Sequence, residues 1–221
     1  HLPTRRQRQM CIRDSLTPGD CIVLTRMEHH SNIVPWQMLA QERGVEVLVV
    51  ELNEDGTLDG DMFEAHLARE PKLVAFTHVS NALGTVNDVK TWTKRAHDAG
   101  ATVLVDGAQA VPHLAVDVRD LDVDFYTFSG HKTYGPTGIG ILYGKEALLD
   151  AVPPWRGGGE MIDTVSFEKG TTFNELPYKF EAGTPHISGG IALGVSLDWM
   201  NEGGLAALTG HEHVLTTHAH D

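Results

Sequence analysis

Three side chains that can do chemistry lie close together between Ser129 and Lys132: a hydroxyl, an imidazole and an amine. Residues 125–128 before them are aromatic or β-branched, which favours a strand, and Gly130 interrupts that pattern. A lysine in a glycine-bounded loop at a strand end can attack a carbonyl carbon. Ser129 and His131 can donate hydrogen bonds to a phosphate beside it. A single lysine is usually a solvated loop residue, so this interpretation depends on what the fold brings to Lys132.

The rest of the chain predicts an α/β fold in which strands and helices alternate. Strands are expected over residues 21–27, 45–52, 72–79, 101–105, 124–128 and 138–143, and helices over 34–43, 59–68, 87–99 and 189–200. Because these strands are mostly apolar, we expect a mainly parallel sheet with helices on both faces. In such sheets ligands bind at the carboxyl ends of the strands. Several polar residues follow the strands at that edge and predict an active site there: His29, Asn81, Asp106, Gln109 and Lys132.

Pyridoxal phosphate is the cofactor whose needs these residues match. A lysine holds its aldehyde as a Schiff base, and Lys132 is the candidate. The carboxylate of Asp106 can keep the ring nitrogen protonated, and the imidazole of His29 can stack on one face of the ring. The amides of Asn81 and Gln109 can donate hydrogen bonds to the phenolic oxygen of the ring.

The phosphate of the cofactor also needs donors, and Ser129, His131 and the backbone N–H of Gly130 can supply them. Each candidate has an ordinary structural explanation as well. Asp106 can cap a turn, and His29 can be a hydrogen-bonded structural histidine. All of these explanations would have to hold independently, so one shared site is the stronger hypothesis.

Composition and charge restrict the partners of the chain. Its 221 residues include 17 basic and 30 acidic residues, which gives a formal net charge of −13. A protein this acidic does not attract nucleic-acid phosphates or anionic headgroups, and no apolar run approaches the length of a membrane span. Two cysteines, Cys11 and Cys21, are too few for a disulfide scaffold or a zinc site. We therefore expect a cytoplasmic protein that binds neither nucleic acid nor a membrane.

The two ends of the chain differ from its middle. Residues 1–15 are basic, lack the apolar segment of a secretory signal and resemble in part a translated sequencing adapter. We expect a non-native leader over 1–15 and a partial cofactor-binding domain over 16–221. The glycine-rich residues 153–159 are expected to form a mobile wall of a pocket. Residues 211–220 are rich in histidine but lack a supporting ligand pattern, so no metal is expected.

Five segments form a specific set of motifs in a fixed order: residues 27–36 (MEHHSNIVPW), 77–81 (THVSN), 105–110 (VDGAQA), 128–132 (FSGHK) and 180–185 (FEAGTP). Together they resemble the SufS-type cysteine desulfurases, which are also described as selenocysteine lyases. These enzymes belong to the class V aminotransferase family of fold type I pyridoxal enzymes. The resemblance extends from Thr17 to the C-terminus.

The resemblance implies conversion of L-cysteine to L-alanine, with sulfur passing to an enzyme persulfide and then to an acceptor protein for iron–sulfur cluster assembly. It implies that Lys132 and His29 are catalytic, Lys132 as the lysine that binds the cofactor and His29 as the stacking residue. It implies that Asp106 is the partner of the ring nitrogen. The other implied cofactor contacts are Asn81, Gln109, Ser129 and His131. Thr184 would reach the phosphate of the opposite protomer in a homodimer.

Two departures from the family pattern predict an internal fragment that lacks a small C-terminal domain. The Gly-Thr-Thr phosphate-binding turn of the family is missing before the first strand. The cysteine that takes the sulfur lies in the small domain, and nothing after His213 resembles that domain. Cys21 lies inside a predicted strand and cannot replace it. We therefore expect the chain alone to have weak or no desulfurase activity.

Three alternatives remain open from the sequence. A kynureninase-like hydrolase or an epimerase of the same family would share the lysine, the aspartate and the stacking residue. A non-catalytic remnant would act as an interaction partner in iron–sulfur assembly. A metal-binding module would use the terminal histidines.

Overall fold

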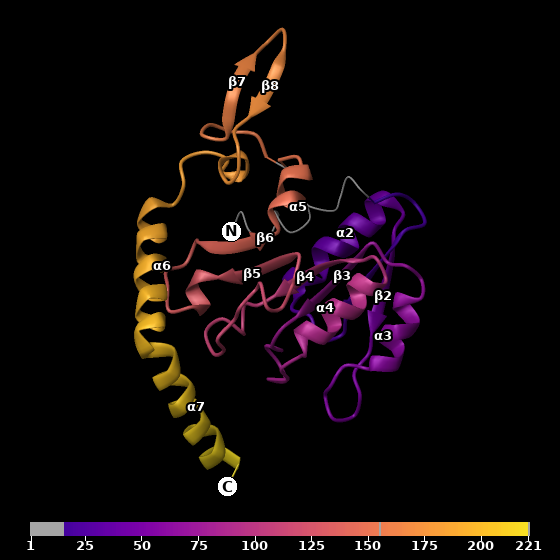
Figure 1. Ribbon diagram of the computed structural model, residues 1–221, viewed down its shortest axis with the longest axis vertical. Helices are drawn as coiled ribbons and strands as arrows, with labels where there is room; N and C mark the ends of the chain where they lie inside the picture. The colour runs from indigo at the N-terminus through magenta and orange to yellow at the C-terminus, as the bar shows by residue number, and fades with distance from the viewer. Residues whose placement is uncertain (1–15, 155, 221) are drawn as a thin grey trace.

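A six-stranded sheet forms the centre of the computed structural model, which describes residues 16–154 and 156–220 (Figure 1). Its strands are β1 (Cys21–Thr25), β2 (Glu46–Val50), β3 (Leu73–Thr77), β4 (Thr102–Asp106), β5 (Phe125–Ser129) and β6 (Gly140–Gly144). They lie in the order β2-β1-β3-β4-β5-β6. Neighbouring strands from β2 to β5 are parallel, and β6 pairs antiparallel with β5. The predicted α/β fold with a mainly parallel sheet is confirmed.

Helices flank this sheet, and a separate hairpin projects away from it (Figure 1). The α-helices are α2 (Val34–Arg43), α3 (Gly60–Leu67), α4 (Val89–Asp98), α5 (Glu146–Ala151), α6 (Ile187–Trp199) and α7 (Leu205–His220). Short 3-10 helices are η1 (His30–Asn32), η2 (Gly130–Lys132) and η3 (Tyr178–Phe180), and a π-helix η4 (Met200–Gly204) joins α6 to α7. The antiparallel hairpin consists of β7 (Ile162–Ser166) and β8 (Gly170–Phe173).

Two hydrophobic clusters cover the two faces of the sheet. Successive residues of a strand point to opposite faces. In β3, Val74 and Phe76 join the cluster that contains Phe63 of α3. Leu73 joins the other cluster, which contains Trp36 of α2. Helices on both faces explain why the strands are apolar at nearly every position.

The structure differs from the predicted elements after β6. The hairpin, α5 and α7 were not predicted. The hairpin was missed because its residues are mostly exposed and carry no alternation of apolar and polar residues. Contacts across the hairpin include the hydroxyls of Thr164 and Thr172, whose Oγ1 atoms are 2.6 Å apart. Helix α6 begins at Ile187, before the predicted start, because Nδ1 of His186 accepts the N–H of Gly189 and caps the helix. The expected leader lies outside the described residues.

Gly107, directly after β4, passes close to the ring of Tyr126. A Cβ atom at this position would lie 2.0 Å from Cε1 of Tyr126. The ring is buried, and its Oη lies 2.9 Å from Nδ1 of His78, so it has little room to move. We predict that Gly107→Ala lowers the free energy of unfolding by about 2 kcal/mol or more, because overpacking strains a close-packed core. Chemical denaturation measures this loss.

Gly60 in the first turn of α3 provides a matched control. A Cβ atom there would meet no other atom within 4 Å. Gly60→Ala should therefore leave the stability unchanged or raise it slightly, because alanine favours a helix more than glycine does. Equal stability of the two variants would contradict the packing argument.

Candidate functional site

The candidate site lies at the carboxyl ends of four neighbouring parallel strands. β1, β3, β4 and β5 are adjacent in the sheet, so the segments that follow them leave it at one edge. Adjacent strands lie about 4.8 Å apart, so the four strand ends span about 14 Å. His29 follows β1, Asn81 follows β3 and Asp106 ends β4. The predicted convergence of polar residues on one edge of the sheet is confirmed, while their individual roles stay predictions.

Asp106 is the acidic residue at the centre of this edge. It is only 4% exposed, and its Oδ1 accepts a hydrogen bond of 3.0 Å from the N–H of Ala108. Its backbone is in register with Thr77 of β3 on one side and Thr127 of β5 on the other. Charges in such a buried site are screened less than on the surface, so the carboxylate can hold a cationic group of a ligand.

Lys132 lies in η2, the short helix directly after β5. The N–H of Gly130 donates to the carbonyl of Ile139 at 3.0 Å, and the N–H of Thr133 donates back to Gly130 at 2.9 Å. The buried hydroxyl of Thr133 also donates to the carbonyl of Ser129 at 3.1 Å. A Cβ atom on Gly130 would lie 2.9 Å from the side chain of Ile139, so glycine permits this close approach. These bonds fix the backbone of Lys132 just after β5, the strand that pairs with β4.

His29 is exposed and caps the N-terminus of η1. Its Nδ1 accepts the N–H of Ser31 at 3.1 Å and lies 2.8 Å from the hydroxyl of the same residue. A backbone N–H can only donate, so Nδ1 must accept, and the neutral ring carries its proton on Nε2. The imidazole is thus held in one orientation at the end of β1.

Two amide side chains of the predicted set line one cavity. Asn81 and Gln109 both border a cavity of about 380 Å³ at the ends of β3 and β4. His113 lines the same cavity, and its Nδ1 lies 3.0 Å from Oε2 of Glu212 in α7. The structure therefore brings together the two amides that were expected to act together.

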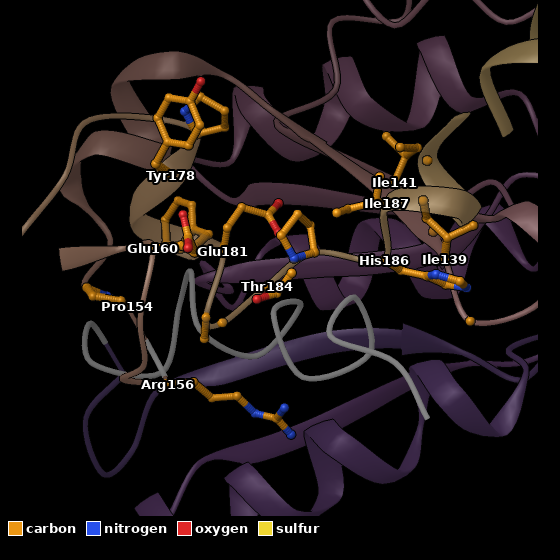
Figure 2. Close-up of a pocket in the computed structure, with 18 of the residues that line it drawn as sticks. Ile139, Ile141, Pro154, Arg156, Glu160, Tyr178, Glu181, Thr184, His186 and Ile187 are labelled. Atoms are coloured by element: carbon orange, nitrogen blue, oxygen red, sulfur yellow. The ribbon is translucent and has the colours of Figure 1, made fainter. Parts of the chain in front are cut away.

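The remaining predicted residues lie on two different parts of the chain. Ser129 is the last residue of β5, and His131 is an exposed residue of η2. Thr184 lies in the exposed loop before α6 and lines a larger cavity of about 820 Å³ (Figure 2). Pro154 and Arg156 border this cavity too, as expected of residues in a pocket wall, while the predicted mobility of the segment 153–159 stays a prediction. The role expected for Thr184 across a protomer interface stays a prediction.

Glu28 is a buried carboxylate that sequence reasoning did not select. It is 7% exposed and accepts hydrogen bonds from Thr25, Asn32 and the backbone of Thr77. Burial raises the pKa of Glu28 from 4.5 to about 7, against the lowering effect of these bonds, and the nearby charge of Asp106 adds to the rise. The signal in the sequence was an acidic residue next to a candidate histidine at the end of an apolar strand.

Cys21 has the properties of a structural thiol. It lies in β1, is 4% exposed, and has its Sγ 3.6 Å from the carbonyl of Arg69. Burial raises the pKa of the Cys21 thiol, which disfavours the thiolate that attack or sulfur transfer requires. The structure agrees with the expectation that Cys21 does not accept sulfur.

The described residues contain no group of three or more histidine, cysteine or acidic side chains that could hold a metal ion. The structure therefore gives no support to the alternative of a metal-binding module on α7. Among the helices of the described residues, none is long and apolar enough to cross a membrane.

Fold and site together define an α/β domain with a polar site at the carboxyl ends of its parallel strands. Residues 8–221 match the model of the aminotransferase class-V family, and the chain belongs to this family. The family assignment expected from the five motifs is confirmed.

Individual relatives agree with this assignment. Over 207 residues the chain is 55% identical to a cysteine desulfurase of Dickeya dadantii (strain 3937). The matched region covers 94% of this chain and 50% of the relative. The apo structure of a cysteine desulfurase from Thermococcus onnurineus NA1 has a TM-score of 0.92 and 39% identity, covering 97% of this chain and 54% of that one. A C-DES mutant with glycine covalently linked to its PLP cofactor has a TM-score of 0.73 and 27% identity, covering 85% of this chain and 50% of that one. The chain thus spans about half the length of the curated relatives it matches.

The raised pKa of Glu28 predicts how stability depends on pH. The folded state binds the Glu28 proton more tightly than the unfolded chain, so its contribution is complete below pH 4.5 and is lost as the pH rises through about 7. The loss is on the order of 3 kcal/mol. We predict that Glu28→Gln removes this part of the pH dependence, because glutamine does not titrate.

Denaturation of the wild type and of Glu28→Gln at several pH values between 5 and 8, roughly the range over which the linkage acts, measures the effect. The difference in unfolding free energy between the two proteins should shift steadily in favour of the variant as the pH rises. Parallel curves would show that Glu28 does not titrate in this range.

Proposed function

We propose that this chain forms the cofactor-binding part of a pyridoxal phosphate-dependent cysteine desulfurase. One observation carries the proposal: four adjacent parallel strands bring an amine, a buried carboxylate, an imidazole and amides to one edge. The identity of 55% with a cysteine desulfurase over 207 residues supports the same activity.

The chemistry of these donors fits pyridoxal phosphate. Lys132 would hold the aldehyde carbon, Asp106 the ring nitrogen and His29 one face of the ring. A carboxylate that is 4% exposed suits a protonated ring nitrogen, because the surroundings screen their attraction weakly. The remaining donors would bind the phosphate and the phenolic oxygen: Ser129 and His131 the former, Asn81 and Gln109 the latter.

When bound, the cofactor supplies an electron sink for negative charge that develops at the Cα atom of the substrate. Asp106 keeps a proton on the ring nitrogen, which maintains that capacity. The amine of Lys132 removes a proton from Cα of L-cysteine or shuttles protons during formation of L-alanine. His29, whose neutral ring carries a proton on Nε2, orients the ring and can act as a general acid.

The sulfur of L-cysteine must pass to a thiolate. Cys21 does not suit this role, because it is buried and its pKa is raised. We propose that the accepting cysteine belongs to a further segment of a longer protein, because the chain spans about half the length of its relatives. From that cysteine the sulfur would pass to an acceptor protein.

Finer features of the proposal rest on the SufS-type motifs. These features are a role in iron–sulfur cluster assembly, activity on selenocysteine, a cytoplasmic location and a homodimer in which Thr184 reaches the phosphate of the opposite protomer. An apolar row on α6 supports self-association, since such rows commonly mark protein interfaces. Its members recur every four residues and are 46% to 67% exposed: Ile187, Ile191, Val195 and Trp199.

A covalent link to Lys132 is the first test. The purified chain mixed with pyridoxal phosphate should gain a visible absorbance, and reduction with borohydride should fix the cofactor on Lys132. We predict that Lys132→Ala abolishes both signals, because Lys132 follows β5 at the edge where Asp106 lies and its amine would form the link.

Lys94→Ala is the matched control, since Lys94 lies in α4 and pairs at the surface with Asp98. It should bind the cofactor as the wild type does. A colourless wild type, or a modified lysine other than Lys132, would refute the assignment.

Turnover of L-cysteine is the second test. We predict that the chain with cofactor forms little alanine and little sulfide, and that Cys21→Ala does not change either amount, because the buried thiol cannot reach substrate. Chromatography of alanine and a sulfide assay give the measurement. Robust sulfide release by this chain would contradict the prediction, and release of alanine from kynurenine or racemisation of an amino acid would favour the alternative activities of the family.

A further inference from the structure

Glu28 is a buried acidic side chain that the proposed chemistry does not use. It lies between β1 and the turn that contains His29, and it is 7% exposed. Removing a carboxylate from water is unfavourable unless hydrogen bonds compensate for the lost hydration. Its position is therefore to be explained by the groups that surround it.

Donors from three elements of the described chain converge on this carboxylate. The hydroxyl of Thr25 donates to Oε1 at 2.5 Å, and the backbone N–H of Thr77 donates to the same oxygen at 2.9 Å. The side-chain amide of Asn32 donates to Oε2 at 2.6 Å. Thr25 ends β1, Asn32 ends η1 and Thr77 ends β3. Glu28 thus ties the turn that contains His29 to two neighbouring strand ends.

The direction of these bonds is set by groups that can only donate. The indole N–H of Trp36 donates to Oδ1 of Asn32 at 2.9 Å, so the amide nitrogen of Asn32 must point at Glu28. The backbone N–H of Thr77 also can only donate. Both oxygens of Glu28 must accept, which a carboxylate does. An amide of the same size would turn its own NH₂ group toward one of these donors.

The same contacts reach the two candidate cofactor residues nearest to Glu28. The N–H of Asn32 donates to the carbonyl of His29 at 2.7 Å, so a fixed Asn32 also fixes the peptide of His29. On the other side, Thr77 is in register with Asp106 in the neighbouring strand, and its hydroxyl, which donates to the carbonyl of Val79 at 2.9 Å, lies 3.3 Å from the Asp106 carbonyl. Burial raises the pKa of Glu28, and the charge of Asp106 on the next strand but one adds to the rise.

We infer that Glu28 is a positioning residue of the proposed cofactor site: its carboxylate fixes the His29 turn against the end of β3, beside the strand end that carries Asp106. This inference rests on the proposed function, in which His29 stacks on the cofactor ring. Lys132 is held by hydrogen bonds of η2 and β5 that do not involve Glu28. Loss of the Glu28 carboxylate therefore loosens the imidazole and leaves the lysine in place.

Glu28→Gln tests the inference at a pH above about 7, where the folded Glu28 is ionised, because it keeps the size of the side chain and removes one of its two acceptors. Binding of pyridoxal phosphate is followed by visible absorbance, and the visible circular dichroism of the bound cofactor reports how its ring is held. We expect binding about tenfold weaker than in the wild type, by analogy with other lost charged hydrogen bonds. We also expect an altered dichroism per bound cofactor, with borohydride still fixing the cofactor on Lys132.

Asp124→Asn is a matched control at the opposite edge of the sheet. Asp124 directly precedes β5, is 6% exposed, and accepts hydrogen bonds from the N–H of Val103 at 2.8 Å and from Lys145 at 2.9 Å. Its Oδ2 also lies 2.9 Å from Nε2 of His97. The variant thus alters a buried carboxylate that has several partners, and it leaves the residues at the cofactor edge unchanged. This variant should lose stability in denaturation while its cofactor binding and dichroism stay those of the wild type.

The outcomes separate the inference from the proposed function. If the wild type binds the cofactor on Lys132 and folded Glu28→Gln binds it equally well with the same dichroism, the inference alone is wrong. Equal weakening by Asp124→Asn would also overturn it, because the effect would then be one of general stability. A wild type that binds no cofactor refutes the proposed function and the inference with it.

Thr25→Val decides the matter if Glu28→Gln does not fold. Valine keeps the branched shape and removes the hydroxyl, which donates to Glu28 at 2.5 Å and accepts the N–H of Met27 at 3.2 Å. We expect binding about threefold weaker, since one hydrogen bond to Glu28 is lost and the carboxylate stays. Unchanged binding and dichroism of this variant would overturn the inference.

Discussion

Parallel pairing of β3, β4 and β5 is the constraint on which the candidate site depends. The register places Thr77, Asp106 and Thr127 side by side in three neighbouring strands. The pairing continues past the strands, since the N–H of His78 donates to the carbonyl of Asp106 at 2.9 Å and the N–H of Gly107 donates to Thr127 at 2.8 Å. A slip by one residue would turn the Asp106 side chain to the other face of the sheet. The carboxylate and the Lys132 loop are therefore brought to one edge by backbone hydrogen bonds, before any side chain interacts.

Electrostatics at this edge favour a cation. The chain carries a formal net charge of −13, and two acidic residues, Glu28 and Asp106, are buried near each other. Burial is the main reason that the pKa of Glu28 is raised, three hydrogen bonds oppose the rise, and the charge of Asp106 adds a smaller increase. A protonated ring nitrogen beside Asp106 would offset the charge of Asp106. This charge pattern is compatible with the cofactor proposed for the site.

Much of the fold was predictable, because its signals are local. Each strand of the main sheet was expected close to its observed position, since a continuous apolar run bounded by turn residues indicates a buried strand from local sequence alone. Polar residues at or just after strand ends, such as Asp106 and Lys132, could be selected as candidates for the same reason. Glu28 was missed because its partners Asn32 and Thr77 come together only after β1 and β3 pair. The hairpin β7–β8 was missed because its side chains are largely exposed, so burial leaves no pattern in its sequence.

Under the proposed function, Glu28 and His29 divide anchoring and chemistry between two neighbouring residues after β1. Where β1 ends, successive side chains face different surroundings: Glu28 is buried and His29 is exposed. The buried residue accepts hydrogen bonds from β1, η1 and β3, while the exposed one would offer its imidazole to the proposed cofactor. Removing the imidazole of His29 and removing its anchor Glu28 therefore have different effects on the proposed site. The first removes the stacking surface, and the second leaves the surface but widens the range of positions that it takes. A site built in this way needs the rigid strand ends as much as it needs the reactive groups, because orientation is what distinguishes His29 from an ordinary surface histidine.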